Sequence, residues 1–74
     1  MSSGVEREFD KKLYVLAAVE EALAVYGDFG SLEMDNSGDA WTISFSEVVD
    51  GLEPDTLADE FANHVLAGTV ERNR

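Results

Sequence analysis

Oxygen-bearing side chains recur between Asp35 and Glu47 with a spacing close to that of a calcium-binding loop. Asp35, Ser37 and Asp39 occupy alternate positions, as the first ligands of such a loop do. The loop also requires a glycine at its sixth position and a bidentate glutamate at its twelfth. Ala40 stands at the sixth position, and Glu47 falls one residue late. These departures favour a turn between two strands, and they leave Asp35, Asp39 and Glu47 as weak candidates for metal ligands.

Groups that could perform catalysis are sparse in this chain. It contains a single histidine, His64, and no cysteine, which leaves few groups from which to assemble a hydrolytic triad or a zinc site. His64 is expected to pair with Glu60, which lies one helical turn earlier. The segment Gly30-Ser31-Leu32 departs from the motif of acyl carriers, in which an aspartate precedes the modified serine. We therefore predict that the protein is not an enzyme and that it carries no cofactor.

The charge distribution narrows the classes of partner. The formal net charge is −11, and no lysine or arginine occurs between Leu13 and Glu71. A field of this sign repels nucleic-acid backbones and anionic membrane surfaces, and it favours a basic protein or peptide. The acids gather around the predicted hairpin and at the start of the last helix, which we expect to form one acidic end of the molecule. The residues expected to contact a partner there are Glu33, Asp35, Asp55 and Asp59.

Size and composition indicate one small folded domain. The chain has 74 residues, of which 45% are hydrophobic, and a domain of this length has room for one modest core. Residues 1–4 are expected to be a disordered lead, and residues 5–74 the domain. The N-terminal stretch lacks the apolar core of a signal peptide, and no apolar run is long enough to span a membrane. We therefore expect a soluble cytoplasmic protein.

The periodicity of the apolar residues predicts the elements that must position these side chains. Alternation favours a strand over residues 5–10, another over 31–35 and a third through Trp41, Ile43 and Phe45. Helical spacing predicts helices over residues 11–26 and from Pro54 toward Arg72. The order is β-α-β-β-α, so we expect an α+β fold: a three-stranded antiparallel sheet with two helices on one face. The third strand should be central, the opposite face wet, and strand 31–35 an edge protected by its acids.

The start of the first helix carries two further expectations. Asp10 precedes the helix and is expected to cap it, while Phe9 should pack on Tyr14 one turn inside. Leu13, Leu16 and Leu23 widen the apolar stripe of this helix beyond what one core requires. That excess fits either a helix packed into the sheet with a few exposed leucines or an interface with a second copy of the chain.

Two stretches of the chain resemble a known family. They are Phe9-Asp10-Lys11-Lys12-Leu13-Tyr14, which leads into an alanine-rich helix, and Asp59-Glu60-Phe61-Ala62-Asn63-His64-Val65-Leu66, which runs on toward Arg72. With the hairpin between them they resemble the HxsD-like family, the small accessory proteins of the His-Xaa-Ser repeat system. The resemblance spans about Val5 to Arg72. It implies an accessory role beside a radical-SAM maturase and a repeat-containing peptide, with no catalytic residues to carry over.

Two functions from different classes follow from these features. The first is a non-catalytic accessory or adaptor protein that binds a peptide or a maturase partner. The second is a structural homo-oligomer that pairs through its first helix, and a strict monomer at micromolar concentration in sedimentation would exclude it. A weaker third alternative is an acidic metal-responsive module.

Overall fold

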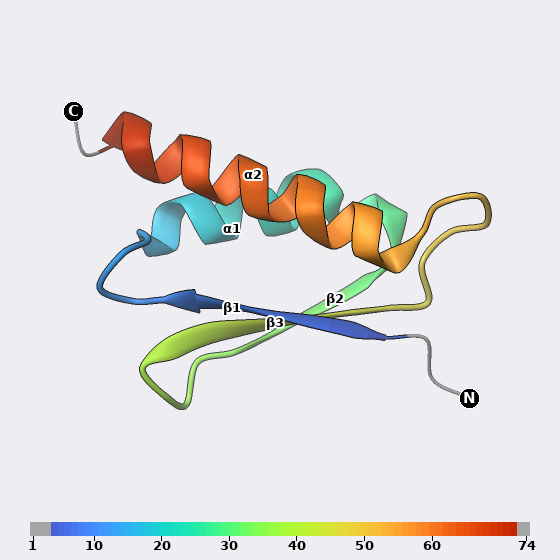
Figure 1. Ribbon diagram of the computed structural model, residues 1–74, viewed down its shortest axis with the longest axis horizontal. Coiled ribbons are helices and arrows are strands. Elements are labelled where there is room, and N and C mark those ends of the chain that lie inside the picture. Colours follow the sequence, from blue (N-terminus) through green and yellow to red (C-terminus); the bar gives the residue numbers. More distant parts are fainter. Residues whose placement is uncertain (1–3, 73–74) are drawn as a thin grey trace.

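The computed structural model describes residues 4–72, which form a three-stranded sheet with helices on one side (Figure 1). The expected lead therefore lies, except for Gly4, outside the described residues. The elements are β1 Val5–Asp10, α1 Leu16–Tyr26, the short 3-10 helix η1 Gly27–Phe29, β2 Ser31–Asp35, β3 Ala40–Ser46 and α2 Pro54–Arg72. The strands pair antiparallel in the order β1-β3-β2. The predicted α+β fold is confirmed, with β3 in the centre of the sheet.

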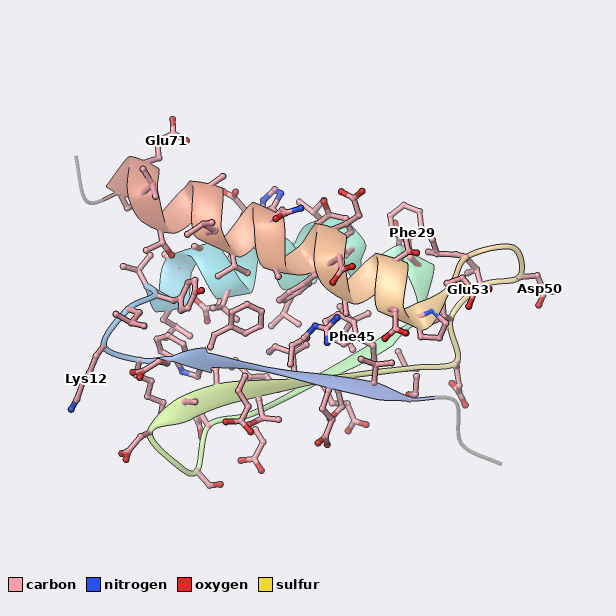
Figure 2. The ribbon with its side chains drawn as sticks, viewed as in Figure 1. Lys12, Phe29, Phe45, Asp50, Glu53 and Glu71 are labelled. Carbon is pink, nitrogen blue, oxygen red and sulfur yellow. The ribbon has the colours of Figure 1, made fainter. Side chains whose placement is uncertain are left out.

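The core lies between the sheet and the helices because each strand alternates apolar and polar residues. Trp41, Ile43 and Phe45 of β3 are buried, and Figure 2 shows Phe45 between the two layers. The ring centroids of Phe45 and Phe61 of α2 are 5.2 Å apart, and the ring planes are nearly perpendicular. Aromatic pairs favour this edge-to-face arrangement. The rings of Phe9 and Phe61 also pack together. Phe61 thus joins α2 to two strands.

The two helices run in opposite directions and pack closely on each other (Figure 1). Ala18, Val19 and Ala22 of α1 are fully buried. Where the helices approach, α2 carries Gly68, and a Cβ atom at this position would lie 3.0 Å from the Cβ atom of Ala18. The small residues at this crossing therefore allow the two helices to share one layer over a narrow sheet.

The first helix begins later than predicted, at Leu16 rather than at residue 11. The Asp10 side chain accepts a hydrogen bond from the Lys12 backbone N–H at 2.8 Å, and the Asp10 carbonyl accepts from the N–H groups of Leu13 and Tyr14. Asp10 therefore closes a local turn and does not cap the helix, as aspartate often does after a strand. The predicted contact of Phe9 with Tyr14 is present, with ring centroids 5.4 Å apart.

The excess leucines of the first apolar stripe fall mostly outside the core. Leu13 is 68% exposed and Leu16 is 40% exposed, whereas Leu23 is half-buried beside the core. Leu13 precedes α1 and Leu16 is its first residue, so the late start of the helix leaves these two side chains at the surface. The core does not account for these two leucines, and pairing through α1 stays a prediction.

We expect the Gly68→Val variant to be less stable than the parent by about 1–3 kcal/mol, because its side chain would overpack the contact with Ala18. Chemical denaturation measures this change. Ala67→Val is the matched control, since Ala67 is the exposed neighbour on the same helix. Equal stabilities of the two variants would show that the helix crossing tolerates a larger residue.

Candidate functional site

The face of the sheet that points away from the helices is polar and uncovered. All helices lie on the other side of the sheet (Figure 1), so the outward residues of each strand meet solvent. We call this surface the open face and define it by the outward residues of the three strands. They are Glu6, Glu8, Asp10, Ser31, Glu33, Asp35, Ala40, Thr42, Ser44 and Ser46.

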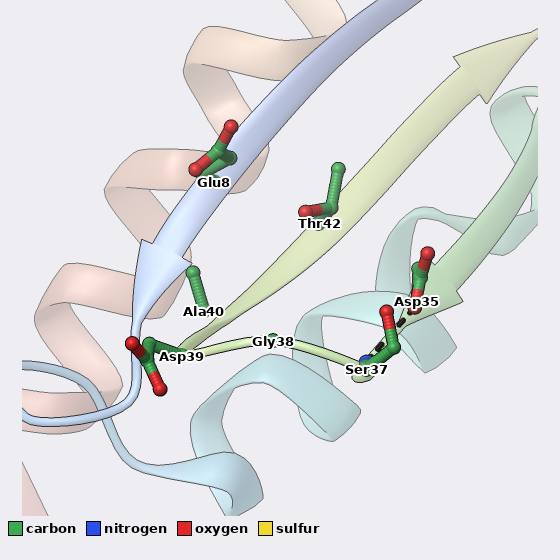
Figure 3. Close-up of a pocket in the computed structure, with 7 residues that line it drawn as sticks. All are labelled: Glu8, Asp35, Ser37, Gly38, Asp39, Ala40 and Thr42. Carbon is green, nitrogen blue, oxygen red and sulfur yellow. Dashed lines mark hydrogen bonds between the residues drawn. The ribbon is translucent and has the colours of Figure 1, made fainter.

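The strand register arranges the open face in rows across the sheet. Ser44 of β3 lies opposite Glu6 of β1 and opposite Glu33 of β2. In the next row Thr42 lies opposite Glu8 and Asp35, as Figure 3 shows from the open side. Each of these rows therefore has a carboxylate on both outer strands and a hydroxyl on the central strand.

The carboxylates of the open face are not neutralised within the fold. No ion pair among residues 4–72 involves Glu6, Glu8, Glu33 or Asp35. The Ser44 hydroxyl donates to Glu6 Oε2 at 3.3 Å, which is a neutral partner. Two strand spacings separate the acids of one row, roughly 10 Å, which is about the screening length at 0.1 M salt. Like charges at this range repel weakly, and a cation placed between them would be attracted to both.

Asp35 is held in its charged form by the hairpin turn. The Ser37 backbone N–H donates to Asp35 Oδ1 at 2.9 Å. This hydrogen bond, with a second from the Ser37 side chain and the nearby charge of Lys11, lowers the pKa of the Asp35 carboxyl. Lys11 itself donates to the Asn36 carbonyl at 2.9 Å. It ties the turn after β1 to the hairpin.

A shallow hollow of about 240 Å³ lies at the hairpin end of the open face (Figure 3). Three of the residues around it are acidic. Its lining consists of Glu8, Asp35, Ser37, Gly38, Asp39, Ala40 and Thr42. Pockets for small molecules are larger and mainly apolar, so this hollow suits one extended cationic side chain better than a compact organic ligand.

The predicted metal ligands do not come together. Asp35 and Asp39 both border the hollow, but Glu47 follows the opposite end of β3 and accepts a hydrogen bond from the Ser31 hydroxyl at 3.1 Å. Over residues 4–72, no group of three or more histidine, cysteine, aspartate or glutamate side chains is placed to hold a metal ion. The calcium-like spacing is thus folded into a β-hairpin.

The predicted partner residues divide between two regions. Glu33 and Asp35 lie on the open face, whereas Asp55 is on the first turn of α2. Asp59 accepts a hydrogen bond from Arg7 at 2.9 Å, so its charge is already paired. The hairpin turn and the start of α2 lie at opposite ends of the molecule (Figure 1), and the expectation of one acidic end is therefore wrong. The acids that share the open face with Glu33 and Asp35 are instead Glu6 and Glu8, which lie across β3 from them.

His64 pairs with the neighbouring helix and not with Glu60. Its Nε2 atom lies 2.9 Å from Glu21 Oε1 of α1, and the Arg72 guanidinium donates to Glu21 Oε2 at 3.3 Å. Hydrogen bonds from His64 and Arg72 lower the pKa of Glu21. The spacing on α2 alone pointed to Glu60, but the antiparallel packing of the helices brings Glu21 closer. This cluster lies on the helical side and braces the two helices.

Comparisons with protein-family models, with curated proteins and with solved structures gave no match. The HxsD-like resemblance therefore stays a prediction. Among the described residues, no helix is long and apolar enough to cross a membrane.

We expect Glu21→Gln to lower the thermal unfolding midpoint at neutral pH, with Glu20→Gln as the control that removes an adjacent exposed charge. The pKa of Glu21 is lowered in the folded state. Its charge therefore stabilises the fold at pH values above the unfolded-state pKa of about 4.3, and this stabilisation is lost as the pH falls through the folded-state pKa. The difference from the parent should therefore shrink below about pH 4.3. A difference that persists undiminished at lower pH would show that Glu21 acts through packing.

We expect no calcium binding in the micromolar range, because Glu47 lies far along β3 from Asp35 and Asp39. Isothermal titration with calcium chloride at physiological salt measures this, and Asp39→Asn is the matched variant. Heat of binding that disappears in Asp39→Asn would contradict the arrangement of these residues as a simple hairpin.

Proposed function

We propose that this protein is a non-catalytic accessory or adaptor domain that binds a basic segment of a partner protein or peptide on its open face. The observation that supports the proposal most directly is the pair of rows in which Glu6 and Glu33, and Glu8 and Asp35, flank the hydroxyls of β3. None of these four acids forms an ion pair among residues 4–72. A lysine or arginine would gain two carboxylates at once.

The basic residues of the chain strengthen this interpretation by where they are used. Arg7 and Arg72 are both engaged with acids on the helical side, and Lys11 is bound to the hairpin backbone. These three cations thus stabilise the fold and leave the open face acidic. A complementary field of this kind raises association rates and excludes acidic partners.

The HxsD-like resemblance supports a partner class for this proposal. The family's accessory role implies that the basic segment belongs to a maturase or to its substrate peptide. The cytoplasmic location expected from the sequence is compatible with this role. The single histidine and the lack of cysteine in the sequence are consistent with a role in binding.

A structural homo-oligomer is the second candidate, and one observation favours it. Several large apolar side chains are exposed on the helical side, among them Leu16 and Val25 of α1 and Leu66 and Val70 of α2. Leu66 and Val70 are one turn apart on the same helix. A dimer formed through the helices would leave the open face free, so the two functions are compatible.

We expect the double variant Glu8→Gln/Glu33→Gln to bind a short oligolysine peptide about tenfold more weakly than the parent at low salt, because each substitution removes one open-face charge. Fluorescence anisotropy of the labelled peptide measures the affinity. Binding by the parent should also weaken steeply when the salt concentration is raised.

The matched control is Asp50→Asn/Glu53→Gln, which removes the same charge from the loop before α2 (Figure 2). Its affinity for oligolysine should fall by a clearly smaller factor. Equal losses in the two double variants would mean that only net charge attracts the peptide and would overturn the open face as the binding site.

A further inference from the structure

β2 is an outer strand whose second edge is open. In the part of the chain that the structure describes, β2 pairs with β3 alone. Its backbone hydrogen-bonding groups on the far side are therefore available for another strand. Its five residues, Ser31–Asp35, alternate between exposed and half-buried. A strand added at this edge would meet one polar face and one apolar face.

The other outer strand, β1, is guarded. α2 packs directly over β1, and Arg7 on the helical side of β1 reaches Asp59 of α2 at 2.9 Å. A charged side chain that points inward from an edge strand disfavours the addition of another strand at that edge. On β2 the corresponding inward residues are Leu32 and Met34, which are both apolar and pack against the core.

The helix above β2 leaves apolar groups on the same side. α1 packs mainly on α2 and η1, and its backbone lies farther from β2 than from these two helices. Ala18 and Glu21 face α2, through Gly68 and Arg72 respectively. Leu16 and Leu23 are seven residues apart, so they lie on nearly one line of the helix, well over a quarter turn from Ala18 and Glu21. They therefore project on the side of α1 away from α2, where the sheet ends at β2.

The acids of β2 determine which strand this edge accepts. Side chains on an added strand would lie about 5 Å from their cross-strand neighbours Glu33 and Asp35. In an antiparallel pair of two copies centred on Glu33, the two Glu33 carboxylates would face each other, and like charges so placed are destabilising. A second copy of the chain is thus disfavoured at this edge, and a basic strand is favoured.

We propose that β2 binds its basic partner by strand addition, with lysine or arginine side chains on the open face alternating with apolar side chains beside Leu32 and Met34. This inference rests on the proposed function and specifies its binding mode. The main chain of the partner would supply the hydrogen bonds, and the alternation of its side chains would supply the specificity.

The experiment compares two labelled peptides of identical composition, one with lysine and valine in strict alternation and one with the lysines in a single block. Fluorescence anisotropy at low salt should show about tenfold tighter binding of the alternating peptide to the intact chain. Methylation of the backbone nitrogens of alternate residues distinguishes strand pairing from charge alone. One methylated register should bind like its parent, and the other should lose most of its affinity.

A charge-reversal pair of variants places the site. Glu33→Lys on β2 should weaken the alternating peptide strongly, whereas Glu53→Lys in the loop before α2 changes the net charge equally and should have a smaller effect. Equal affinities for alternating and block peptides, or indifference to both methylated registers, would overturn strand addition while leaving charge recognition by the open face intact. Failure of both peptides to bind would overturn the proposed function as well.

Discussion

The packing of one apolar sheet face against two helices is the constraint on which the rest of this fold depends. A domain of 74 residues buries a limited area, and here that area centres on Phe45, Ile43 and Phe61. Both helices are needed to cover this face, and the small residues at Ala18 and Gly68 let them lie side by side. Among residues 4–72, no element covers the other face. The outward residues of the strands therefore meet solvent there and take no part in the core.

The architecture was predictable from the sequence because it depends on periodicity. Trp41, Ile43 and Phe45 alternate with hydroxyl residues, and the helical spacing after Pro54 is regular. The spacing of the apolar residues was therefore enough to predict which segments form strands and which form helices. The start of α1 was not predictable in this way. Two local solutions compete for Asp10, a helix cap and a turn closed by its own side chain, and the position of Thr69 on α2 helps to decide between them. The Thr69 hydroxyl accepts a hydrogen bond from the Val15 backbone N–H at 3.2 Å, at the residue that precedes the helix.

The candidate site was harder to predict because its members are neighbours only through strand pairing. The alternation of β1 indicated that Glu6 and Glu8 point outward, but the register with β3 was needed to place them opposite Ser44 and Thr42. The fold predicted from the sequence suggested a different grouping, in which Asp55 and Asp59 lay at the same end of the molecule as the hairpin acids. Asp59 instead neutralises Arg7. His64 follows the same principle, since its partner Glu21 belongs to another helix.

The placement of charge relative to the edges gives the acidic field a more specific meaning than solubility. Acids required only for solubility would be best dispersed, since repulsion between neighbours destabilises a small domain. Here the cations Arg7 and Arg72 are paired on the helical side, and the open face keeps its carboxylates in facing rows. On the unguarded edge, Glu33 and Asp35 oppose pairing between identical copies, which protects an exposed strand from self-association. In the proposed binding mode the same two charges would attract a basic strand, so one arrangement would both oppose self-association and favour a basic partner.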